Sequence, residues 1–266
     1  MRAGLLTRSR PLCVWYDSSG QKKGAFVRVA VVIPTYNRAD MLGDALASLD
    51  KQTERCEVFV YDDGSTDETF AVASRFDCAY LRGEHGGSVT VAFNRAVAWV
   101  LSRTEAPYIA WLGSDDAYAP EAVRHRADAL DALPDAGIVF SGLRFVGASR
   151  WLPKRGIDHS IDVGRYTPGE LSTFSRNVHT GTAMFRREVW IPWRDEIRMS
   201  GADLLWVYEQ VTRGVGVAYV PETLYYCRKH DGRNIYRWRG ADPAEKHAEA
   251  VRYQEIADEI RREHEW

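Results

Sequence analysis

Cysteine is scarce in this sequence. Its 266 residues include four cysteines, none in a C-x-x-C pair, at positions Cys13, Cys56, Cys78 and Cys227. Structural zinc sites and disulfide frameworks need closely spaced or numerous cysteines, so neither is expected. Scattered single cysteines are typical of a reducing compartment, and we therefore predict a cytoplasmic protein.

Long apolar runs and an excess of one charge are also missing. The most apolar stretch, residues 27–34, has the length of a strand and contains Arg28, whereas a transmembrane helix needs about 20 apolar residues. Leu5 and Leu6 form too short an apolar core for a secretory signal. The 35 Lys and Arg residues nearly balance 37 Asp and Glu residues, giving a net charge of -2. No general attraction to nucleic acid or an anionic membrane is expected, and an anionic ligand would need local contacts.

The remaining composition is that of a folded globular protein. Hydrophobic residues make up 45% of the chain and charged residues 27%, which excludes wholesale disorder and collagen-like repeats. The length suits one large domain or two small ones.

Strand and helix patterns alternate in the first half of the chain. Residues 28–33 form a β-branched run that ends at Pro34, as expected of a strand buried on both faces of a parallel sheet. Helical spacing of apolar residues separates this run from further predicted strands at residues 57–61, 78–81 and 108–112. The alternation predicts an α/β fold with a central, mostly parallel sheet flanked by helices.

The two ends of the chain differ from this pattern. Residues 1–26 show no sustained period and are expected to form a tail or an added edge. Residues 236–266 include a charged segment with apolar residues near helical spacing, which predicts a C-terminal amphipathic helix.

Three polar loops follow predicted strands. They span residues 34–38, 62–67 and 113–118. Ligands of parallel α/β sheets collect at the carboxyl ends of the strands, so we expect these loops to converge on one site.

Asp62 and Asp63 stand at the end of a predicted buried strand. Ser65 and Glu68, which follow, fit a capping box, and this would make the segment a simple helix start. Capping leaves two adjacent carboxylates unexplained, because their repulsion and partial desolvation cost free energy. We favour a binding role for the pair, in which the carboxylates accept hydrogen bonds from a nucleobase or from ribose hydroxyls.

A second carboxylate pair follows a later strand. Ser114, Asp115 and Asp116 can form an Asx turn before a helix near Pro120, which explains one aspartate more easily than two. Carboxylate oxygens at a strand end are also ligands that Mg²⁺ or Mn²⁺ takes when it is shared with a diphosphate. From the residues alone, both interpretations stay open.

These segments together resemble the family 2 glycosyltransferases of GT-A fold. The main motifs lie at residues 31–38 (VVIPTYNR), 60–67 (VYDDGSTD) and 108–116 (YIAWLGSDD), and weaker ones at 181–186 (GTAMFR), 201–203 (GAD) and 228–230 (RKH). Their occurrence in order is more specific than any single motif. The resemblance implies a GT-A domain over residues 27–235, with a nucleotide-sugar-binding half at 27–118 and an acceptor half at 119–235.

The resemblance also implies an activity, namely inverting transfer of a hexose from a nucleoside diphosphate sugar to an acceptor hydroxyl. Asp203 matches the family's catalytic base. Asp115 matches the last Asp of the metal-binding DXD motif, with Asp116 in support, and His230 falls at a further metal or diphosphate contact. The cofactor would be Mn²⁺ or Mg²⁺. The implied donor-binding residues are Pro34, Thr35, Tyr36, Arg38, Asp62, Asp63, Asn94, Ser114 and Asp115.

Some downstream residues have competing interpretations. Asp203 could cap a helix over residues 204–211, and His230 could be a solvated loop residue. Indoles usually belong to protein cores, yet sugars stack on them, and both roles are open for Trp151, Trp190, Trp193 and Trp206.

Two positions depart from the family pattern. Gly113 stands where many members carry the first Asp of DXD, and Phe93 stands beside Asn94 where many carry Arg. The first change removes a carboxylate that often helps to hold ribose or metal. The second leaves the nucleotide unassigned, with UDP the family's commonest choice and dTDP and GDP open.

Other functions fit less well. A nucleotidyltransferase needs a glycine-rich phosphate loop after the first strand, and a nicotinamide oxidoreductase needs G-x-G-x-x-G there. Pro34 and the residues after it contain neither. A GT-A module that binds a nucleotide sugar without catalysis stays as the alternative. The expected partners are the donor and a glycan, lipid-linked or other hydroxyl acceptor of polysaccharide biosynthesis, with peripheral membrane contact at the inner face in the lipid-linked case, and no nucleic acid.

Overall fold

The computed structural model describes residues 27–147, 180–197, 201–230 and 242–263 with their side chains, together with the backbone of two short strands. These strands, β1 (Val14–Tyr16) and β2 (Lys22–Gly24), pair antiparallel in a two-stranded sheet of their own. Trp151 lies outside the described residues.

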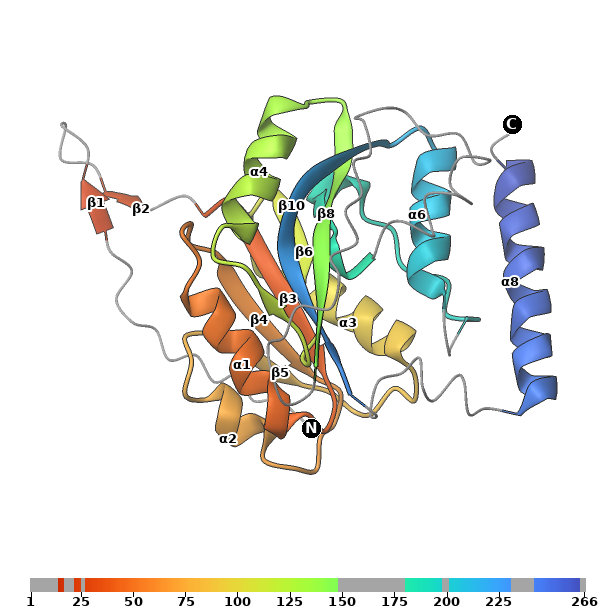
Figure 1. The fold of residues 1–266 in the computed structure, drawn as a ribbon, viewed down its shortest axis with the longest axis horizontal. Helices are drawn as coiled ribbons and strands as arrows, with labels where there is room; N and C mark the ends of the chain where they lie inside the picture. Colours follow the sequence, from red (N-terminus) through yellow and green to blue (C-terminus); the bar gives the residue numbers. More distant parts are fainter. Residues whose placement is uncertain are drawn as a thin grey trace.

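An eight-stranded sheet forms the centre of the molecule (Figure 1). Its strand order is β5-β4-β3-β6-β9-β8-β10-β7. The strands are β3 (Val29–Thr35), β4 (Glu57–Asp62), β5 (Ala79–Arg82), β6 (Tyr108–Trp111), β7 (Ala117–Tyr118), β8 (Ala136–Gly147), β9 (Met184–Arg186) and β10 (Gly216–Lys229). Only β7 and β9 run antiparallel to their neighbours in this sheet. The expected α/β fold with a mostly parallel sheet is confirmed.

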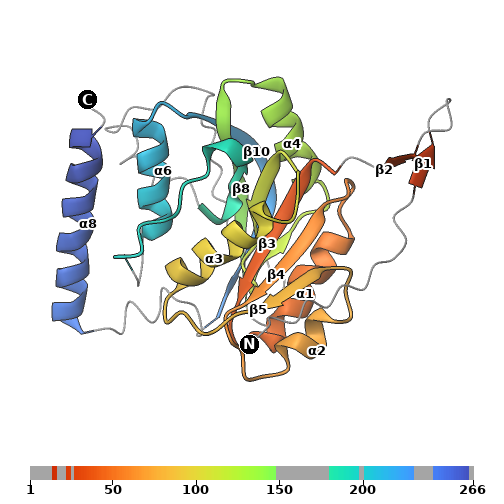
Figure 2. The same cartoon turned by 180° about the vertical axis from the view of Figure 1, so that it is seen from behind.

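Helices cover both faces of this sheet (Figures 1 and 2). One face carries α1 (Ala39–Asp50), α2 (Thr69–Ala73) and α4 (Ala122–Ala132). The other carries α3 (Val89–Leu101), α6 (Ala202–Thr212) and α8 (Pro243–Glu263). Two short 3₁₀ turns, η1 (Thr180–Thr182) and η2 (Arg187–Val189), flank β9.

The first strand of the sheet, β3, explains this layered arrangement. Val29, Val31 and Ile33 join the core beneath α1 and α4, while Ala30 and Val32 join the core beneath α3 and α6. All five side chains are 0% exposed. A strand covered by helices on both faces needs apolar side chains at odd and at even positions, because successive side chains point to opposite faces. This is why its sequence is a continuous apolar run.

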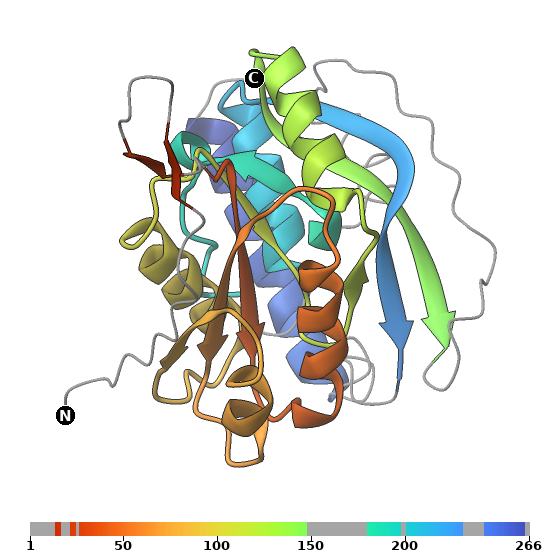
Figure 3. The same cartoon turned by 90° about the vertical axis from the view of Figure 1, so that its left-hand side faces the viewer.

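The register of β3 places the polar loops side by side. Its last residue, Thr35, pairs with Asp62 at the end of β4, and Val32 pairs with Trp111 at the end of β6. Figure 3 shows the arrowheads of the parallel strands, including β8 and β10, pointing toward the same edge. The loops that follow β3, β4 and β6 therefore emerge together at that edge.

The capping-box interpretation of Ser65 and Glu68 is wrong. Helix α2 begins at Thr69, and Glu68 makes no side-chain cap. The cap comes from Asp67, which accepts hydrogen bonds from the Thr69 amide at 3.1 Å and from the Ala39 amide of α1 at 3.0 Å. One carboxylate thus serves the starts of two helices, an arrangement that depends on tertiary structure.

The last helix, α8, runs alongside α6 in both views of Figures 1 and 2. Its buried residues, Ile256, Ala257 and Ile260, lie one helical turn apart and join the core that α6 also enters. No helix in the described part of the chain has both the length and the apolar composition of a membrane span.

Candidate active site

A cavity of about 530 Å³ opens at the carboxyl ends of β3 and β6. It is lined by seven of the residues predicted from sequence, namely Pro34, Thr35, Tyr36, Arg38, Ser114, Asp115 and Asp203. Helix α3, η1 and the loop after η2 complete the wall with Val89, Ala92, Phe93, Thr180, Gly181 and Trp193. The other predicted residues, Asp62, Asp63, Asn94, Asp116 and His230, are outside this lining.

Asp115 lies at the cavity wall and contacts His230. The His230 Nε2 atom is 2.8 Å from Asp115 Oδ2, although the two residues are 115 positions apart. Because a carboxylate only accepts hydrogen bonds, the imidazole donates here. His230 directly follows strand β10, which ends at Lys229, and so lies beside the loop that follows β6.

Asp116 points away from the cavity into the protein. Its side chain is 5% exposed. One carboxylate oxygen accepts a hydrogen bond from the Tyr225 hydroxyl at 2.6 Å, and the other accepts one from the Arg228 amide at 2.7 Å. Burial and the Asp116 carboxylate raise the pKa of Tyr225, so this phenol stays a donor. Asp116 therefore fixes the end of β10 against the loop that carries Asp115.

The donor set around Asp115 can be compared with the needs of a divalent cation. In the described residues no group of three or more His, Cys, Asp and Glu side chains gathers as a cation site would require. Asp115 and His230 together offer one oxygen and one nitrogen, and their 2.8 Å separation is close to that of two ligands of one ion. They fit a cation that takes its remaining ligands from a diphosphate and from water.

Gly113 has no room for a side chain. A Cβ atom there would lie 2.8 Å from Asp116 Oδ2 and 2.9 Å from Asp115 Oδ1. The Gly113 amide also donates to the Tyr225 hydroxyl at 3.3 Å. At the position of the first DXD aspartate, this glycine is therefore in tight contact with the two carboxylates that follow it.

Asp62 and Asp63 are buried behind the cavity wall. They are 1% and 3% exposed. Asp62 accepts hydrogen bonds from the Ser65 amide at 2.8 Å and from the Tyr80 hydroxyl. Burial and the hydrogen bond to Asp62 raise the pKa of Tyr80, which keeps this hydroxyl protonated.

Asp63 reaches the cavity through another side chain, His85. Its carboxylate accepts from His85 Nδ1 at 2.7 Å and from the Gly86 amide at 3.0 Å. The His85 ring stacks on Tyr36, which lines the cavity, with centroids 4.1 Å apart and planes inclined by 14°. Sequence reasoning missed His85, and its position beside the glycine pair after β5 was the only local signal.

Asp203 lies in the first turn of α6 and faces the cavity. The N-cap of α6 is Gly201, with φ of 95° and no side-chain cap bond, so the capping interpretation of Asp203 does not describe its contacts. Its carboxylate accepts a hydrogen bond from the Thr180 hydroxyl. Sequence reasoning missed Thr180, which directly precedes the motif at residues 181–186.

An aromatic wall closes the cavity near α3. Phe93 and Trp193 stack with ring centroids 3.8 Å apart, and both line the cavity. The Asn94 amide holds this wall, because it donates to the Trp193 carbonyl and accepts from the Trp193 amide, each at 2.8 Å. Trp206 is 1% exposed and belongs to the core, and Trp190 packs against that core.

Comparison with known proteins identifies similar chains. The sequence profile described as "Glycosyl transferase family 2" matches residues 30–191. The uncharacterized glycosyltransferase RP339 of Rickettsia prowazekii is 31% identical over 114 residues, which cover 42% of this chain and 34% of that protein. The dolichyl-phosphate hexose transferase of Haloferax volcanii is 27% identical over 198 residues, 74% of this chain and 82% of that protein. The chain thus spans about a third of the first relative and most of the second.

The fold is similar to that of a protein with a solved crystal structure. The crystal structure of S. aureus TarS 1–349 in complex with UDP matches with a TM-score of 0.62 and 19% identity. The match covers 79% of this chain and 63% of that one. At this identity, the similarity shows the fold.

Proposed function

Because the chain belongs to glycosyl transferase family 2, we propose that it transfers a hexose from a nucleoside diphosphate sugar to an acceptor hydroxyl with inversion. One observation carries the proposal. Asp115 and Asp203, which are 88 positions apart, line the same cavity of about 530 Å³. A cation-binding carboxylate and a base on one cavity are what displacement at an anomeric carbon requires.

Asp115 and His230 hold a divalent cation, Mn²⁺ or Mg²⁺, in this proposal. A cation bound there would neutralise the charge on the leaving diphosphate without any proton transfer. The tie of Asp116 to Tyr225 and Arg228 keeps the Asp115 loop and the end of β10 at a fixed separation. The two cation ligands are thus held in place before substrate binds.

The donor nucleoside lies near the loop after β3. Thr35 Oγ1 supports this placement, because it is buried at the cavity wall and has no hydrogen-bond partner among the described residues. A buried hydroxyl without a partner costs free energy, and a ribose or base could supply the partner. Tyr36, backed by His85, offers a flat ring for a base. UDP, which is named in the TarS structure, is the first nucleotide to test, before GDP and dTDP.

Asp203 acts as the general base. The Thr180 hydroxyl fixes one carboxylate oxygen, and the other can accept the proton that an acceptor hydroxyl loses as it attacks. Asp203 lies on the α6 side of the cavity and Asp115 on the β6 side. In this proposal the acceptor hydroxyl therefore attacks from one side of the sugar, and the nucleoside diphosphate leaves from the other.

A second acceptor class is favoured by one relative. The Haloferax volcanii protein, aligned over 74% of this chain, is named for transfer to dolichyl phosphate. A phosphate monoester is already ionised near neutral pH, with a second pKa of about 6, and needs no base. If the acceptor is a lipid phosphate, the protein acts at the inner face of a membrane from the cytoplasm, and Asp203 positions rather than deprotonates.

The test is a donor and acceptor screen with one substitution. The protein is incubated with UDP-, GDP- and dTDP-sugars, with and without Mn²⁺ or Mg²⁺, and release of nucleoside diphosphate is recorded. Asp203→Asn should lower transfer to hydroxyl acceptors and to water by about 10³-fold, leaving a small residual rate. Transfer to a polyprenyl phosphate that survives Asp203→Asn would establish the lipid-phosphate class instead.

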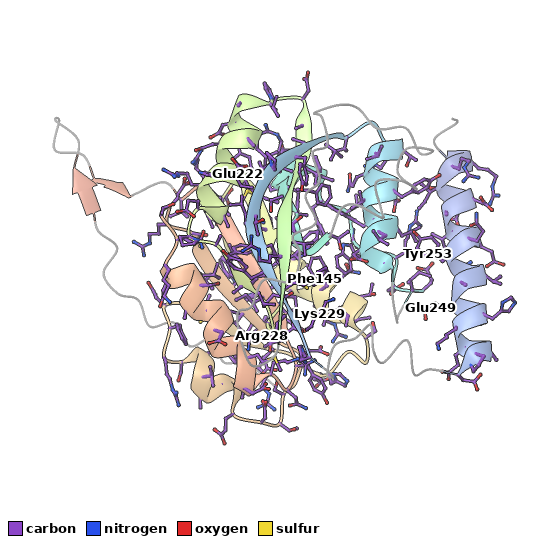
Figure 4. The ribbon with its side chains drawn as sticks, in the orientation of Figure 1. Phe145, Glu222, Arg228, Lys229, Glu249 and Tyr253 are labelled. Carbon is purple, nitrogen blue, oxygen red and sulfur yellow. The ribbon has the colours of Figure 1, made fainter. Side chains whose placement is uncertain are left out.

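The control and the contrary outcome are defined by the same screen. Glu222→Gln changes an exposed carboxylate on β10, which Figure 4 shows well away from Arg228 and Lys229 at the strand end, and should leave release unchanged. Tight donor binding without turnover, with every acceptor tried, would favour the noncatalytic binding module.

A further inference from the structure

Helix α8 brings an aromatic side chain to the start of α6. Tyr253 lies one turn before the buried residues Ile256 and Ala257, on the same side of α8. Figure 4 shows Tyr253 projecting from α8 toward the end of α6 where that helix begins. By contrast, Val251 is 44% exposed on the outer side of α8.

Tyr253 packs against the backbone of Gly201. A Cβ atom on Gly201 would lie 3.2 Å from Cε2 and 3.5 Å from Cδ2 of the Tyr253 ring. Gly201 is also the N-cap residue of α6 and has a left-handed φ of 95°. The ring therefore occupies the space beside the turn that leads into Asp203, and only a glycine permits that approach.

The Tyr253 side chain is also close to Asp203 in electrostatic terms. Burial raises the pKa of Tyr253, and the negative charge of Asp203 and the Tyr208 phenol raise it further. The phenol therefore remains neutral at physiological pH and adds no charge beside the carboxylate.

The first turn of α6 is anchored in the core by Ala202 and Leu205, but its N-cap residue supplies no side chain. Gly201 makes no side-chain cap bond, and helix ends without caps fray. The hydroxyl of Thr180 holds the Asp203 carboxylate from the η1 side. From the α8 side, the ring of Tyr253 packs against the Gly201 turn, in addition to the apolar contacts of Ile256, Ala257 and Ile260 with the core.

We infer that Tyr253 is a positioning residue, which holds the first turn of α6 so that Asp203 faces the cavity. This inference rests on the proposed function of Asp203 as the base. It makes the C-terminal helix part of the acceptor side of the site. The alternative is that Tyr253 only stabilises the contact between α6 and α8.

A double-mutant cycle separates these two roles. Full-length variants are assayed with UDP-N-acetylglucosamine and Mn²⁺ for UDP release to water, at a temperature well below unfolding. Tyr253→Ala should lower kcat about tenfold or more, with the donor KM within about twofold, because small misplacements of a reacting group cost rate rather than binding. In the Asp203→Asn background, Tyr253→Ala should lower the residual rate less than about twofold.

Two variants serve as controls for the cycle. Tyr253→Phe keeps the ring and should retain the wild-type rate within about threefold. Val251→Ala removes an exposed side chain of the same helix and should have no effect. Equal losses from Tyr253→Ala in both backgrounds would overturn the inference, because the residue would then act independently of Asp203.

Hydrogen exchange gives a readout that needs no turnover. The amides of Leu205 and Trp206, which belong to the first hydrogen-bonded turn of α6, should exchange about tenfold faster in Tyr253→Ala than in Val251→Ala. Unchanged exchange there would overturn the positioning role. If Asp203→Asn alone retains the wild-type rate of UDP release, Asp203 is not the base. The inference that Tyr253 positions it is then wrong as well.

Discussion

Restoring the family's first DXD aspartate with Gly113→Asp should damage this protein. The new Cβ would lie 2.8 Å from Asp116 Oδ2 and 2.9 Å from Asp115 Oδ1, distances that side-chain carbons do not adopt. Asp116 cannot swing aside cheaply, because Tyr225 and the Arg228 amide hold both of its oxygens. Overpacking of this kind costs about 1 to 3 kcal/mol.

The second contribution comes from the displaced hydrogen bond. A buried hydrogen bond to a charged group, such as that from Tyr225 to Asp116, is worth about 1.5 to 3 kcal/mol. Together the two terms give a loss of about 4 kcal/mol in the free energy of unfolding. For a chain of this size each kcal/mol lowers the melting temperature by about 2 to 4 °C, so a decrease of about 10 °C is expected.

Thermal unfolding followed by circular dichroism, with and without Mn²⁺, measures this effect. Gly113→Ala is the matched control, because it adds the same Cβ without a third carboxylate and should cost about the same, about 4 kcal/mol; any further loss in Gly113→Asp measures the added charge. Mn²⁺ should recover part of the loss in Gly113→Asp by neutralising the added charge. The reasoning would be refuted by a Gly113→Asp variant that has the melting temperature of the wild type and binds Mn²⁺ more tightly.

Of three further predictions, two concern contacts of the site and the third a buried thiol outside it. His85→Ala should raise the donor KM about tenfold with little change in kcat, because Tyr36 loses its stacking partner; a change in kcat alone would contradict it. Thr180→Val should lower kcat about tenfold by freeing the Asp203 carboxylate, and an unchanged rate would show that this hydrogen bond is dispensable. Burial raises the pKa of Cys56 to about 12, so its alkylation by iodoacetamide at pH 8, followed by mass spectrometry, should be about 10³-fold slower than for an ordinary thiol and should rise with pH. Rapid labelling of native protein would contradict this.

The features predicted well from sequence are those set by local periodicity. The apolar run that became β3 has to be buried on both faces, and a parallel strand between helices is the only common element that does this. Its loop and the loop after β6 then meet because parallel strands share an edge. The convergence of Tyr36 and Asp115 on one cavity follows from that topology, whereas Asp203 is brought there by α6.

The features missed depend on contacts between distant positions. Asp63 and Asp116 have the same sequence signature as Asp115, a carboxylate after a strand, but their side chains turn inward. Their partners, His85 and Tyr225, are 22 and 109 positions away, and the glycine pair beside His85 is the only local signal for either of them. An apolar pattern identifies a buried strand, whereas the direction of a polar side chain is decided by the donors that surround it.

The parallel pairing of β8 with β10 has a consequence for how such an enzyme can change. Parallel strands need a long crossover, and here the described part of that crossover carries η1, β9 and α6, and with them Thr180 and Asp203. The loops after β3 and β6 belong to a separate stretch of chain. Under the proposed function, exchange of this single insert between relatives is expected to change the recipient molecule while the loops after β3 and β6 keep their own sequence.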